Sequence, residues 1–281
     1  MTNENKITGK VILVGAGPGD PELITVKGAR YLQQAEVVLT DRLVSNDILK
    51  EYVHPAAEVI YVGKQCRKGN STPQETINDL IRENALQGKL VVRLKGGDVS
   101  VFSNIFDELQ VLRENNIPYE IIPGVTSALG AAAYAGIPLT ARGYATAVRF
   151  LTYYKSDIVP DAYWKELAAT TDTLVFYMSA ETVDGIVDRL IKYGVREDTF
   201  IAVIEQATTP LQQVHTANIY DFQKQNGAFL SPSLVIVGRV AALHEQFGWI
   251  ANSSDRSSYF KPVAGIQNNL NHNKQANVSR A

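Results

Sequence analysis

The sequence predicts an α/β protein in which a mainly parallel sheet, covered by helices, is followed by a second, mixed α/β domain. In the first half, short apolar runs alternate with segments of helical spacing, which is typical of parallel strands connected by helices. In the second half, strand candidates follow one another with fewer helices between them. Pro138 and Gly143 punctuate a connector between the two patterns, so we place the domain boundary at about residue 140.

The first domain is expected to span residues 9–140. Its strands are predicted where apolar runs lead into glycine, aspartate or lysine, at residues 10–17, 36–41, 58–64 and 89–98. Helices are predicted between them, at residues 25–35, 44–53, 72–88 and 104–116. The helix at 72–88 has the clearest limits, with Pro73 near its start and Gly88 at its end. Residues 117–136 are expected to form a strand, a Pro-Gly turn and a helix of small residues.

The second domain is expected to span residues 141–249. Apolar runs predict strands at residues 147–154, 173–179, 200–207, 212–218 and 233–240, and helices at 162–170, 182–193 and 219–226. Residues 1–8 are polar and are expected to be flexible. Residues 250–281 are polar and rich in asparagine, which predicts a disordered tail.

The composition excludes several classes of function. The formal net charge of −2 provides no basic field to recruit nucleic acid. A single cysteine, Cys66, excludes an internal disulfide and fits a reducing compartment. The N-terminus lacks the apolar core of a signal peptide, and no apolar run approaches the roughly 20 residues that span a bilayer. The four histidines are scattered, so no metal site is expected. We therefore expect a cytoplasmic protein that binds neither membrane nor nucleic acid.

A glycine-rich loop follows the first predicted strand. Gly15, Gly17 and Gly19 alternate in "VGAGPGDPE", as in a dinucleotide-binding loop. The dinucleotide fingerprint needs a third glycine at its sixth position, but this chain has Asp20 there, followed by Pro21. A carboxylate would repel a pyrophosphate, so a dinucleotide is disfavoured. Asp20 could also simply cap a helix that begins at the proline.

Several loops of this kind should meet at one edge of the parallel sheet, where ligands of α/β proteins bind. The turn in "LKGGD" again combines glycines with an aspartate. Backbone-rich turns next to carboxylates suit a cationic cofactor without phosphate, which favours S-adenosylmethionine over NAD. Structural explanations remain open: Asp41 could bind a ribose hydroxyl, Asp98 could close a turn, Thr126 and Ser127 could cap a helix, Met178 could lie in the core, and Arg142 and Arg149 could be surface charges or hold an acidic substrate.

Taken together, the loops and strands resemble the tetrapyrrole methylase family over residues 9–249. The resemblance is carried by "VGAGPGDPELITVKGARYLQQAEVVLTDRLVS", "YVGK", "PQETIN", "VVRLKGGD", "IIPGVTSALGAAAYAGIPLT", "YATAVRFLT", "LVFYMS" and "LVIVGRVAAL". It implies a homodimer of two-domain subunits, with the cofactor in the cleft between the domains. It also implies transfer of methyl groups from two S-adenosylmethionine molecules to uroporphyrinogen III, which gives precorrin-2 for sirohaem and cobalamin and S-adenosylhomocysteine as the second product.

The resemblance also assigns residues. The family's cofactor positions fall on Pro18, Gly96, Gly97, Asp98, Val101, Thr126, Ser127, Met178 and Ala207. Its proton acceptor and donor fall on Asp41 and Lys64. Methyl transfer releases a neutral thioether, so it requires no metal; it requires positioning and a later base, for which Asp41 is suitable.

The chain departs from the family pattern in the segment "VSVFSNIFDEL". The family's substrate-gripping arginine falls at Asn104 and its first glutamate at Asp107. Asparagine cannot make a bidentate charged grip on a carboxylate. The substrate is therefore expected to be held elsewhere, by Arg142 or Arg149, or to be another reduced tetrapyrrole. The alternatives of a different class are an NAD-dependent oxidoreductase and a non-catalytic tetrapyrrole-binding protein.

Overall fold

The computed structural model describes residues 8–63, 72–153, 159–222 and 229–260, and its chain divides into two compact units. Unit 1 contains the residues up to Val125 and those from Phe260 on, and unit 2 spans Thr126–Tyr259. The sequence places the domain boundary at about residue 140, whereas the compact units divide between Val125 and Thr126. The helix of small residues therefore groups with unit 2. The extents of the domains stay a prediction.

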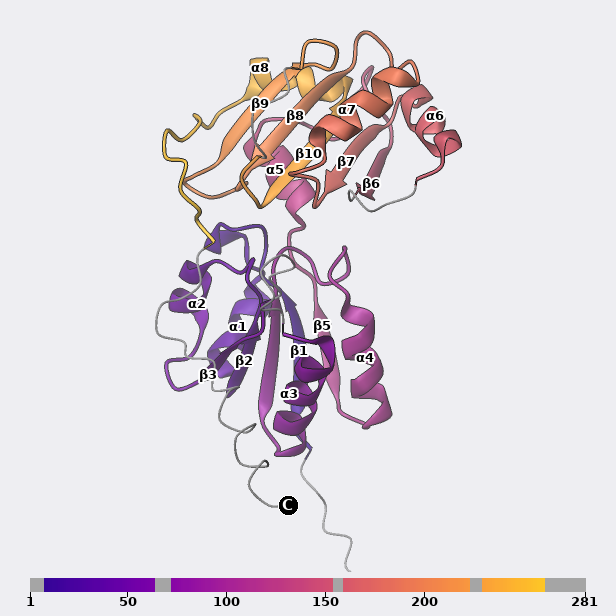
Figure 1. Ribbon diagram of the computed structural model, residues 1–281. Helices are drawn as coiled ribbons and strands as arrows, with labels where there is room; N and C mark the ends of the chain where they lie inside the picture. The colour runs from indigo at the N-terminus through magenta and orange to yellow at the C-terminus, as the bar shows by residue number, and fades with distance from the viewer. Residues whose placement is uncertain (1–7, 64–71, 154–158, 223–228, 261–281) are drawn as a thin grey trace, which may run out of the picture. The chain divides into compact units, whose positions relative to one another are not determined.

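Unit 1 is a five-stranded parallel sheet with helices on both faces (Figure 1). Its strands are β1 (Lys10–Gly15), β2 (Val37–Thr40), β3 (Glu58–Tyr61), β4 (Leu90–Lys95) and β5 (Tyr119–Ile122), in the order β3-β2-β4-β1-β5. Its helices are α1 (Val26–Gln34), α2 (Asn46–Tyr52), α3 (Gln74–Leu86) and α4 (Ile105–Glu114). The predicted alternation of strands and helices is confirmed here.

Alternate side chains of the strands of unit 1 build two separate cores. Val11, Leu13 and Val91 point to one face, where they pack with Ile81 of α3 and Leu112 of α4. Ile12, Val14 and Val92 point to the other face, together with Leu32 of α1 and Ile48 of α2. Successive side chains of a strand face opposite sides, so near-continuous apolar runs are needed in a sheet that is covered on both faces.

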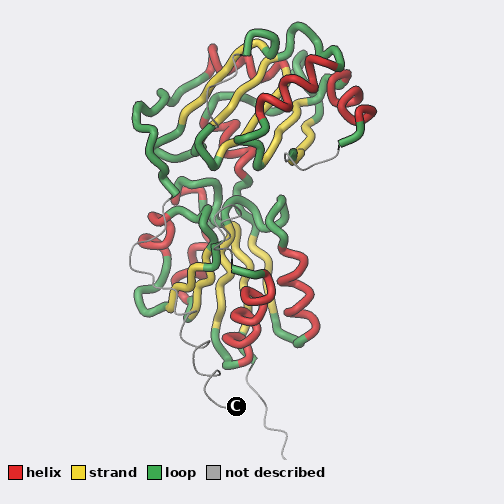
Figure 2. Tube along the Cα trace, in the orientation of Figure 1, coloured by secondary structure: helices red, strands yellow, loops and turns green. Residues whose placement is uncertain are grey.

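Unit 2 is built on a mixed five-stranded sheet in the order β6-β7-β10-β8-β9 (Figure 2). The strands are β6 (Val148–Thr152), β7 (Thr173–Tyr177), β8 (Phe200–Glu205), β9 (Gln213–Asn218) and β10 (Ser233–Gly238). β6 and β7 are parallel, whereas β10 is antiparallel to both β7 and β8. β7 and β8 therefore run in the same direction and end at the same edge of the sheet.

The helices of unit 2 are α5 (Ser127–Tyr134), α6 (Asp161–Ala169), α7 (Val183–Lys192) and α8 (His244–Phe247), with the 3-10 helix η2 (Arg239–Leu243). Trp164 of α6 and Ile186 of α7 pack on Phe176 and Val203 of the sheet. The prediction of a helix at 219–226 is wrong for its described part, because residues 219–222 form turns after β9. η2 and α8 were not predicted.

The chain after Trp249 differs from the sequence-based expectation of disorder in its described part. Residues 251–259 hydrogen-bond to β9 and to the end of β8, with Asn252, Ser253 and Arg256 supplying contacts. Their polar composition provides partners for backbone and side-chain groups of unit 2, so a polar segment can be ordered without an apolar core of its own.

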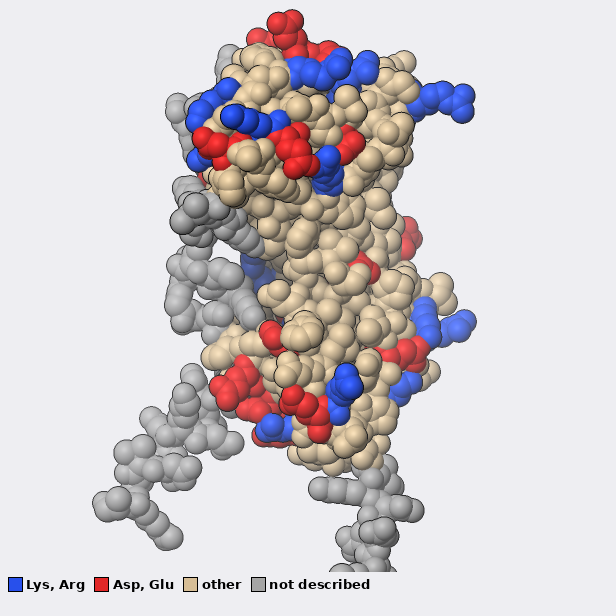
Figure 3. Space-filling view, turned by 90° about the vertical axis from the view of Figure 1, so that its right-hand side faces the viewer, with Lys and Arg blue, Asp and Glu red and all other residues tan. Residues whose placement is uncertain are grey.

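Charged side chains are mixed over the face shown in Figure 3. Acidic and basic groups lie next to one another on both units there, rather than in a large area of one sign. Most described ion pairs are exposed pairs such as Arg82–Asp79 and Arg196–Asp198, which contribute little to stability.

Candidate functional site

The glycine loops of unit 1 touch one another at the carboxyl edge of its sheet. Gly17 and Gly97 exchange two backbone hydrogen bonds, of 3.1 and 2.7 Å, which join the loops after β1 and β4. A Cβ atom on Gly15 would lie 2.6 Å from the amide nitrogen of Gly124 and 2.7 Å from the carbonyl oxygen of Gly97. Only glycine allows backbones this close. The three loops therefore form one continuous surface of backbone groups, with Pro18 buried within it.

Asp98 fastens the loop after β4 to the loop after β5. Its Oδ2 accepts from the amide of Gly124 at 2.9 Å, and its Oδ1 accepts from the amide of Ser100 at 2.8 Å and from the Ser100 hydroxyl. Burial alone would raise the pKa of Asp98, but these hydrogen bonds together hold it below its ordinary value. Asp98 thus closes a turn and also fixes the shape of the glycine surface.

Asp20 lies at the end of the first glycine loop and caps a short helix. Its side chain accepts from the amide of Glu22 at 2.9 Å, at the start of the 3-10 helix η1 (Pro21–Leu23). The N-cap explanation considered for Asp20 is therefore confirmed.

The segment that departs from the family pattern is strained and exposed. Phe102 and Asn104 both have φ near +52°, a left-handed conformation that is uncommon outside glycine. Asn104 precedes α4 without a side-chain capping bond, and Asp107 is exposed in the first turn of the helix. Phe106 is 72% exposed, while Val101 is partly buried. Substrate binding by Asn104 and Asp107 stays a prediction.

A buried charge cluster lies directly beneath this edge of the sheet. Arg93 and Lys95 of β4 share a face with Val91 and meet Glu108 of α4. Glu108 Oε1 accepts from Arg93 Nε at 2.9 Å and from Lys95 Nζ at 3.0 Å, and the Glu108 side chain is fully buried. Arg93 also donates to Asp41 Oδ1 at 2.6 Å. The predicted proton acceptor is therefore held in place by a buried arginine.

Burial affects the two cations of the cluster differently. Burial and the neighbouring Arg93 charge lower the pKa of Lys95, against the opposing effect of Glu108. For Arg93, burial is outweighed by Asp41 and Glu108, which raise its pKa. Asp41 is 27% exposed at the end of β2, so its carboxylate is oriented from below and open to the edge of the sheet.

The sequence analysis missed the roles of Arg93 and Glu108. The available indication was a charged residue within the apolar run "KLVVRLKGG", since arginine is almost never fully buried without a partner. Glu108 lies four residues before the core residue Leu112, on the buried side of α4. Lys64 and Cys66 lie outside the described residues.

Unit 2 brings its predicted cofactor residues to the ends of two strands that run in the same direction. Thr126 precedes α5, and its hydroxyl lies 2.7 Å from the hydroxyl of Tyr177, the last residue of β7. Tyr177 also accepts from the amide of Ala128, so it fixes the start of α5, where Ser127 lies. Met178 follows Tyr177 with φ of +55° and is 47% exposed, which contradicts a core role.

The second strand end carries Ala207. It follows β8 and lies between Gln206 and Thr208, which have φ of +47° and +64°. Ala207 is partly exposed, whereas both neighbours are buried. Positive φ in such residues needs support from the surroundings and often marks a functional loop.

The two arginines proposed to hold an acidic substrate differ in their surroundings. Arg149 is already paired with Asp172 at 2.7 Å and with Glu166 at 2.6 Å. Arg142 is exposed in the turn between Ala141 and Ala145. Arg142 is therefore the more accessible of the two to an acidic ligand.

Two searches of the described residues found nothing. No described helix combines the length and the apolar composition needed to cross a bilayer. Nor do three or more His, Cys, Asp or Glu side chains in these ranges come together in a way that could hold a metal ion.

Comparison with known proteins finds one family over most of the chain. The family model described as tetrapyrrole (corrin/porphyrin) methylases matches residues 10–223. Siroheme synthase from Neisseria meningitidis serogroup A is 44% identical over 258 residues, which are 92% of this chain and 53% of that protein. The chain therefore spans about half the length of the curated relatives it matches.

Solved structures give the same result. Uroporphyrin-III-C-methyltransferase from Thermus thermophilus matches with a TM-score of 0.71 and 35% identity, over 86% of this chain and 98% of that one. The same enzyme complexed with S-adenyl homocysteine matches with a TM-score of 0.70 and 36% identity, over 84% and 100%. A cobalt precorrin-4 methyltransferase matches with a TM-score of 0.71 and 30% identity, over 83% and 95%.

Proposed function

This chain belongs to the tetrapyrrole methylase family, and from that premise we propose that it is an S-adenosylmethionine-dependent C-methyltransferase that converts uroporphyrinogen III to precorrin-2. The observation that carries the proposal is the glycine surface fastened by Asp98, together with the similarity to an enzyme whose structure holds S-adenosylhomocysteine. The relatives named siroheme synthase support a place for the product in sirohaem formation.

The residues of the glycine surface fit this cofactor. Gly15, Gly97 and Gly124 leave backbone groups accessible where side chains would block them. Asp98 and Asp20 place carboxylates at the loops, which suits a positively charged sulfonium better than a pyrophosphate. S-adenosylmethionine supplies the electrophilic methyl group when it is bound. The cofactor contacts proposed for unit 2 are those of Thr126, Ser127, Met178 and Ala207.

The proposed catalytic role of the chain is to position the acceptor carbon and to remove a proton afterwards. Asp41 would take that proton, because it is the partly exposed carboxylate at the end of β2 and Arg93 fixes its orientation. Lys64 would supply the proton donor. Substrate carboxylates would be held by Arg142 or Arg149 in place of the family's arginine at Asn104.

The test is an incubation with enzymatically made uroporphyrinogen III and labelled S-adenosylmethionine. Mass spectrometry counts the methyl groups on the product, and two added groups are expected. Calorimetric titration with S-adenosylhomocysteine and with NAD accompanies it. Tight binding of NAD without S-adenosylhomocysteine would establish the oxidoreductase instead, and cofactor binding with no methyl transfer to any tetrapyrrole would leave a binding protein.

Another reduced tetrapyrrole is the second candidate substrate. It is favoured by Asn104 in place of the arginine, and by the match to a cobalt precorrin-4 methyltransferase. Offering precorrin substrates in the same assay distinguishes the two, since methylation of a precorrin with none of uroporphyrinogen III would select the second.

The proposal extends to the setting of the enzyme. We expect a homodimer in the cytoplasm that acts without a metal, membrane or nucleic acid. Size-exclusion chromatography with light scattering measures the dimer, and full activity in the presence of a chelator checks the independence from metal.

Replacing Asp41 with asparagine is expected to lower kcat about 10²–10⁴-fold, the usual contribution of a general base. Asparagine keeps an oxygen for Arg93 but cannot accept the proton, so the Kd for S-adenosylhomocysteine should stay unchanged. Asp79→Asn, in an exposed pair on α3, is the matched control. A rate within threefold of the wild type would remove Asp41 from the mechanism.

A further inference from the structure

The described residues after α8 run along the edge of the sheet of unit 2. β9 is the last strand in the sheet order, and Asn252 bonds both backbone groups of Val214 on it, accepting at 2.7 Å and donating at 3.0 Å. The amide of Ser253 donates to Gln212 at 3.0 Å. These bonds supply partners to an exposed strand edge. We call residues 252–259 the C-terminal strap.

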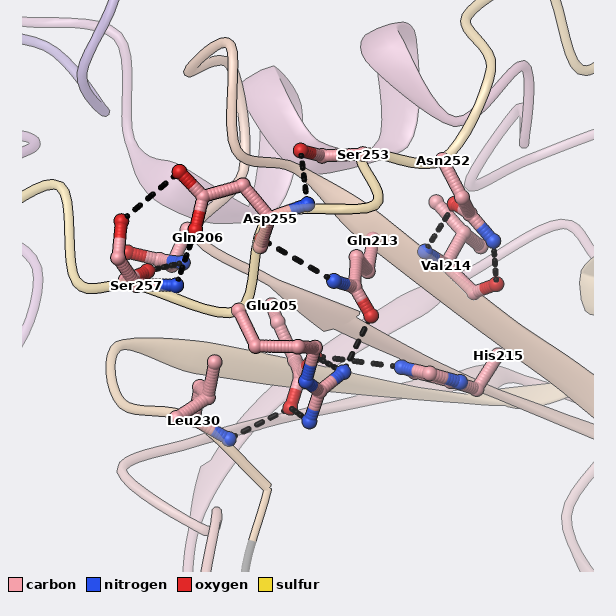
Figure 4. A network of polar contacts seen from close by, with 11 residues as sticks. Glu205, Gln206, Gln213, Val214, His215, Leu230, Asn252, Ser253, Asp255 and Ser257 are labelled. Atoms are coloured by element: carbon pink, nitrogen blue, oxygen red, sulfur yellow. Dashed lines mark hydrogen bonds and ion pairs between the residues drawn. The ribbon is translucent and has the colours of Figure 1, made fainter.

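The strap also reaches a fully buried carboxylate. Glu205, the last residue of β8, is 0% exposed, and Arg256 of the strap donates to its Oε2 at 2.9 Å and to its Oε1 at 3.4 Å (Figure 4). Leu230 donates its amide to Oε1 at 2.5 Å, and His215 Nε2 lies 3.3 Å from Oε2. Arg256 also contacts Gln213. A buried carboxylate needs such partners, so Arg256 is held at this position.

The next residue, Gln206, is gripped by the strap at both ends of its side-chain amide. Its Nε2 donates to the carbonyl of Ser257 at 2.9 Å, and its Oε1 accepts from the amide of Tyr259 at 2.7 Å. Its own amide donates to Pro232 at 2.8 Å. Gln206 and Thr208 have positive φ, and for a β-branched threonine this is a genuine outlier. The strap is therefore part of what holds a strained loop in a single conformation.

Ala207 lies between these two strained residues. We infer that the C-terminal strap is a positioning element for the cofactor, because Arg256 and the clasp on Gln206 set the backbone around Ala207. The inference rests on the proposed function, in which the loop at Ala207 meets S-adenosylmethionine. Residues 252–259 contact the loop, so they would act through it and not on the reacting atoms.

Arg256→Ala in the full chain tests the inference. Removing the guanidinium frees the strap, and the strained loop relaxes. If the competent conformation falls to about a tenth of the population, the apparent Kd for S-adenosylhomocysteine rises about tenfold. Arg256→Lys should recover part of the affinity. Arg196→Ala, which breaks an exposed pair with Asp198 just before β8, is the matched control and should bind as the wild type does.

Hydrogen exchange separates a failure of the inference from a failure of the proposed function. The amides of Gln206, Thr208 and Thr209 should exchange faster in Arg256→Ala than in the wild type, with or without ligand. Absence of binding by the wild type would overturn the proposed function and the positioning of the cofactor. Unchanged affinity and unchanged exchange in a folded Arg256→Ala would overturn the inference alone. If Arg256→Ala does not fold, Asn252→Ala, which loosens the strap at Val214 without touching a buried charge, gives the same test.

Discussion

Replacing Asp98 with alanine is expected to raise the Kd for S-adenosylhomocysteine at least about a hundredfold, roughly 2.8 kcal/mol of binding free energy. The carboxylate of Asp98 is the common acceptor for Gly124 and Ser100, so its loss frees the loop after β4 from the loop after β5. The backbone surface that would meet the cofactor then loses its fixed shape. Both cores of unit 1 are untouched, so the variant should remain folded. Calorimetric titration and far-UV circular dichroism measure the two effects.

Asp98→Asn shows which property of the side chain matters. Asparagine keeps one oxygen for the amide donors but has no charge, so a partial recovery would assign the effect to loop shape. Asp79→Ala, on the exposed face of α3, should bind as the wild type does. An Asp98→Ala protein with unchanged affinity for S-adenosylhomocysteine would refute the cofactor assignment.

The lowered pKa of Asp98 adds a pH dependence of known sign. A carboxylate whose pKa is lower in the folded state than in the unfolded state stabilises the fold at pH values above its unfolded pKa, which is about 3.9. That contribution is lost as the pH falls through the folded pKa. Asp98→Asn should therefore reduce the difference in unfolding free energy between neutral and strongly acidic pH, as measured by urea titrations at each pH.

Replacing Glu108 with glutamine is expected to lower the free energy of unfolding by about 3–5 kcal/mol, as for other buried ion pairs that lose one partner. Glutamine keeps the size and one acceptor oxygen, but Arg93 and Lys95 lose the carboxylate between them. Both tryptophans, Trp164 and Trp249, belong to unit 2. Urea unfolding of unit 1 should therefore be followed by far-UV circular dichroism rather than by tryptophan fluorescence.

The charge cluster offers its own controls. Glu114→Gln, exposed at the end of the same helix, should change the free energy of unfolding by less than about 0.5 kcal/mol. Adding Lys95→Met to Glu108→Gln removes one uncompensated cation, so the double variant should be more stable than the two separate losses predict. A loss below about 1 kcal/mol for Glu108→Gln would show that the cations find other partners.

Much of the fold could be predicted because its elements depend on local patterns. Each predicted strand of unit 1 overlaps an observed one, since a sheet covered on both faces needs apolar runs such as "KVILVG". The helix at 219–226 was misassigned because residues 219–222 close a turn after β9, which depends on pairing distant in sequence. The order of residues 251–259 could not be predicted, because a polar segment is ordered here only by partners on β8 and β9.

The site divides along the same line. Glycine and aspartate at strand ends indicate loops in any parallel sheet, so Gly97 and Asp98 could be found from sequence. Glu108 could not, because its importance comes from meeting Arg93 and Lys95 of another element across the core. Asp20 illustrates the reverse case, in which a residue that stood out in a motif has an ordinary local role as a helix cap.

The contact among Gly15, Gly97 and Gly124 limits how this site can be redesigned. Each of these glycines faces the backbone of another, so a side chain at one would collide with main-chain atoms that no rotamer change can move. Selection for a new cofactor analogue would therefore find few tolerated changes in the loops themselves. Altered selectivity would have to come from neighbouring side chains, such as the exposed Met178 or the partly buried Val101, while the glycine backbone remains a fixed template.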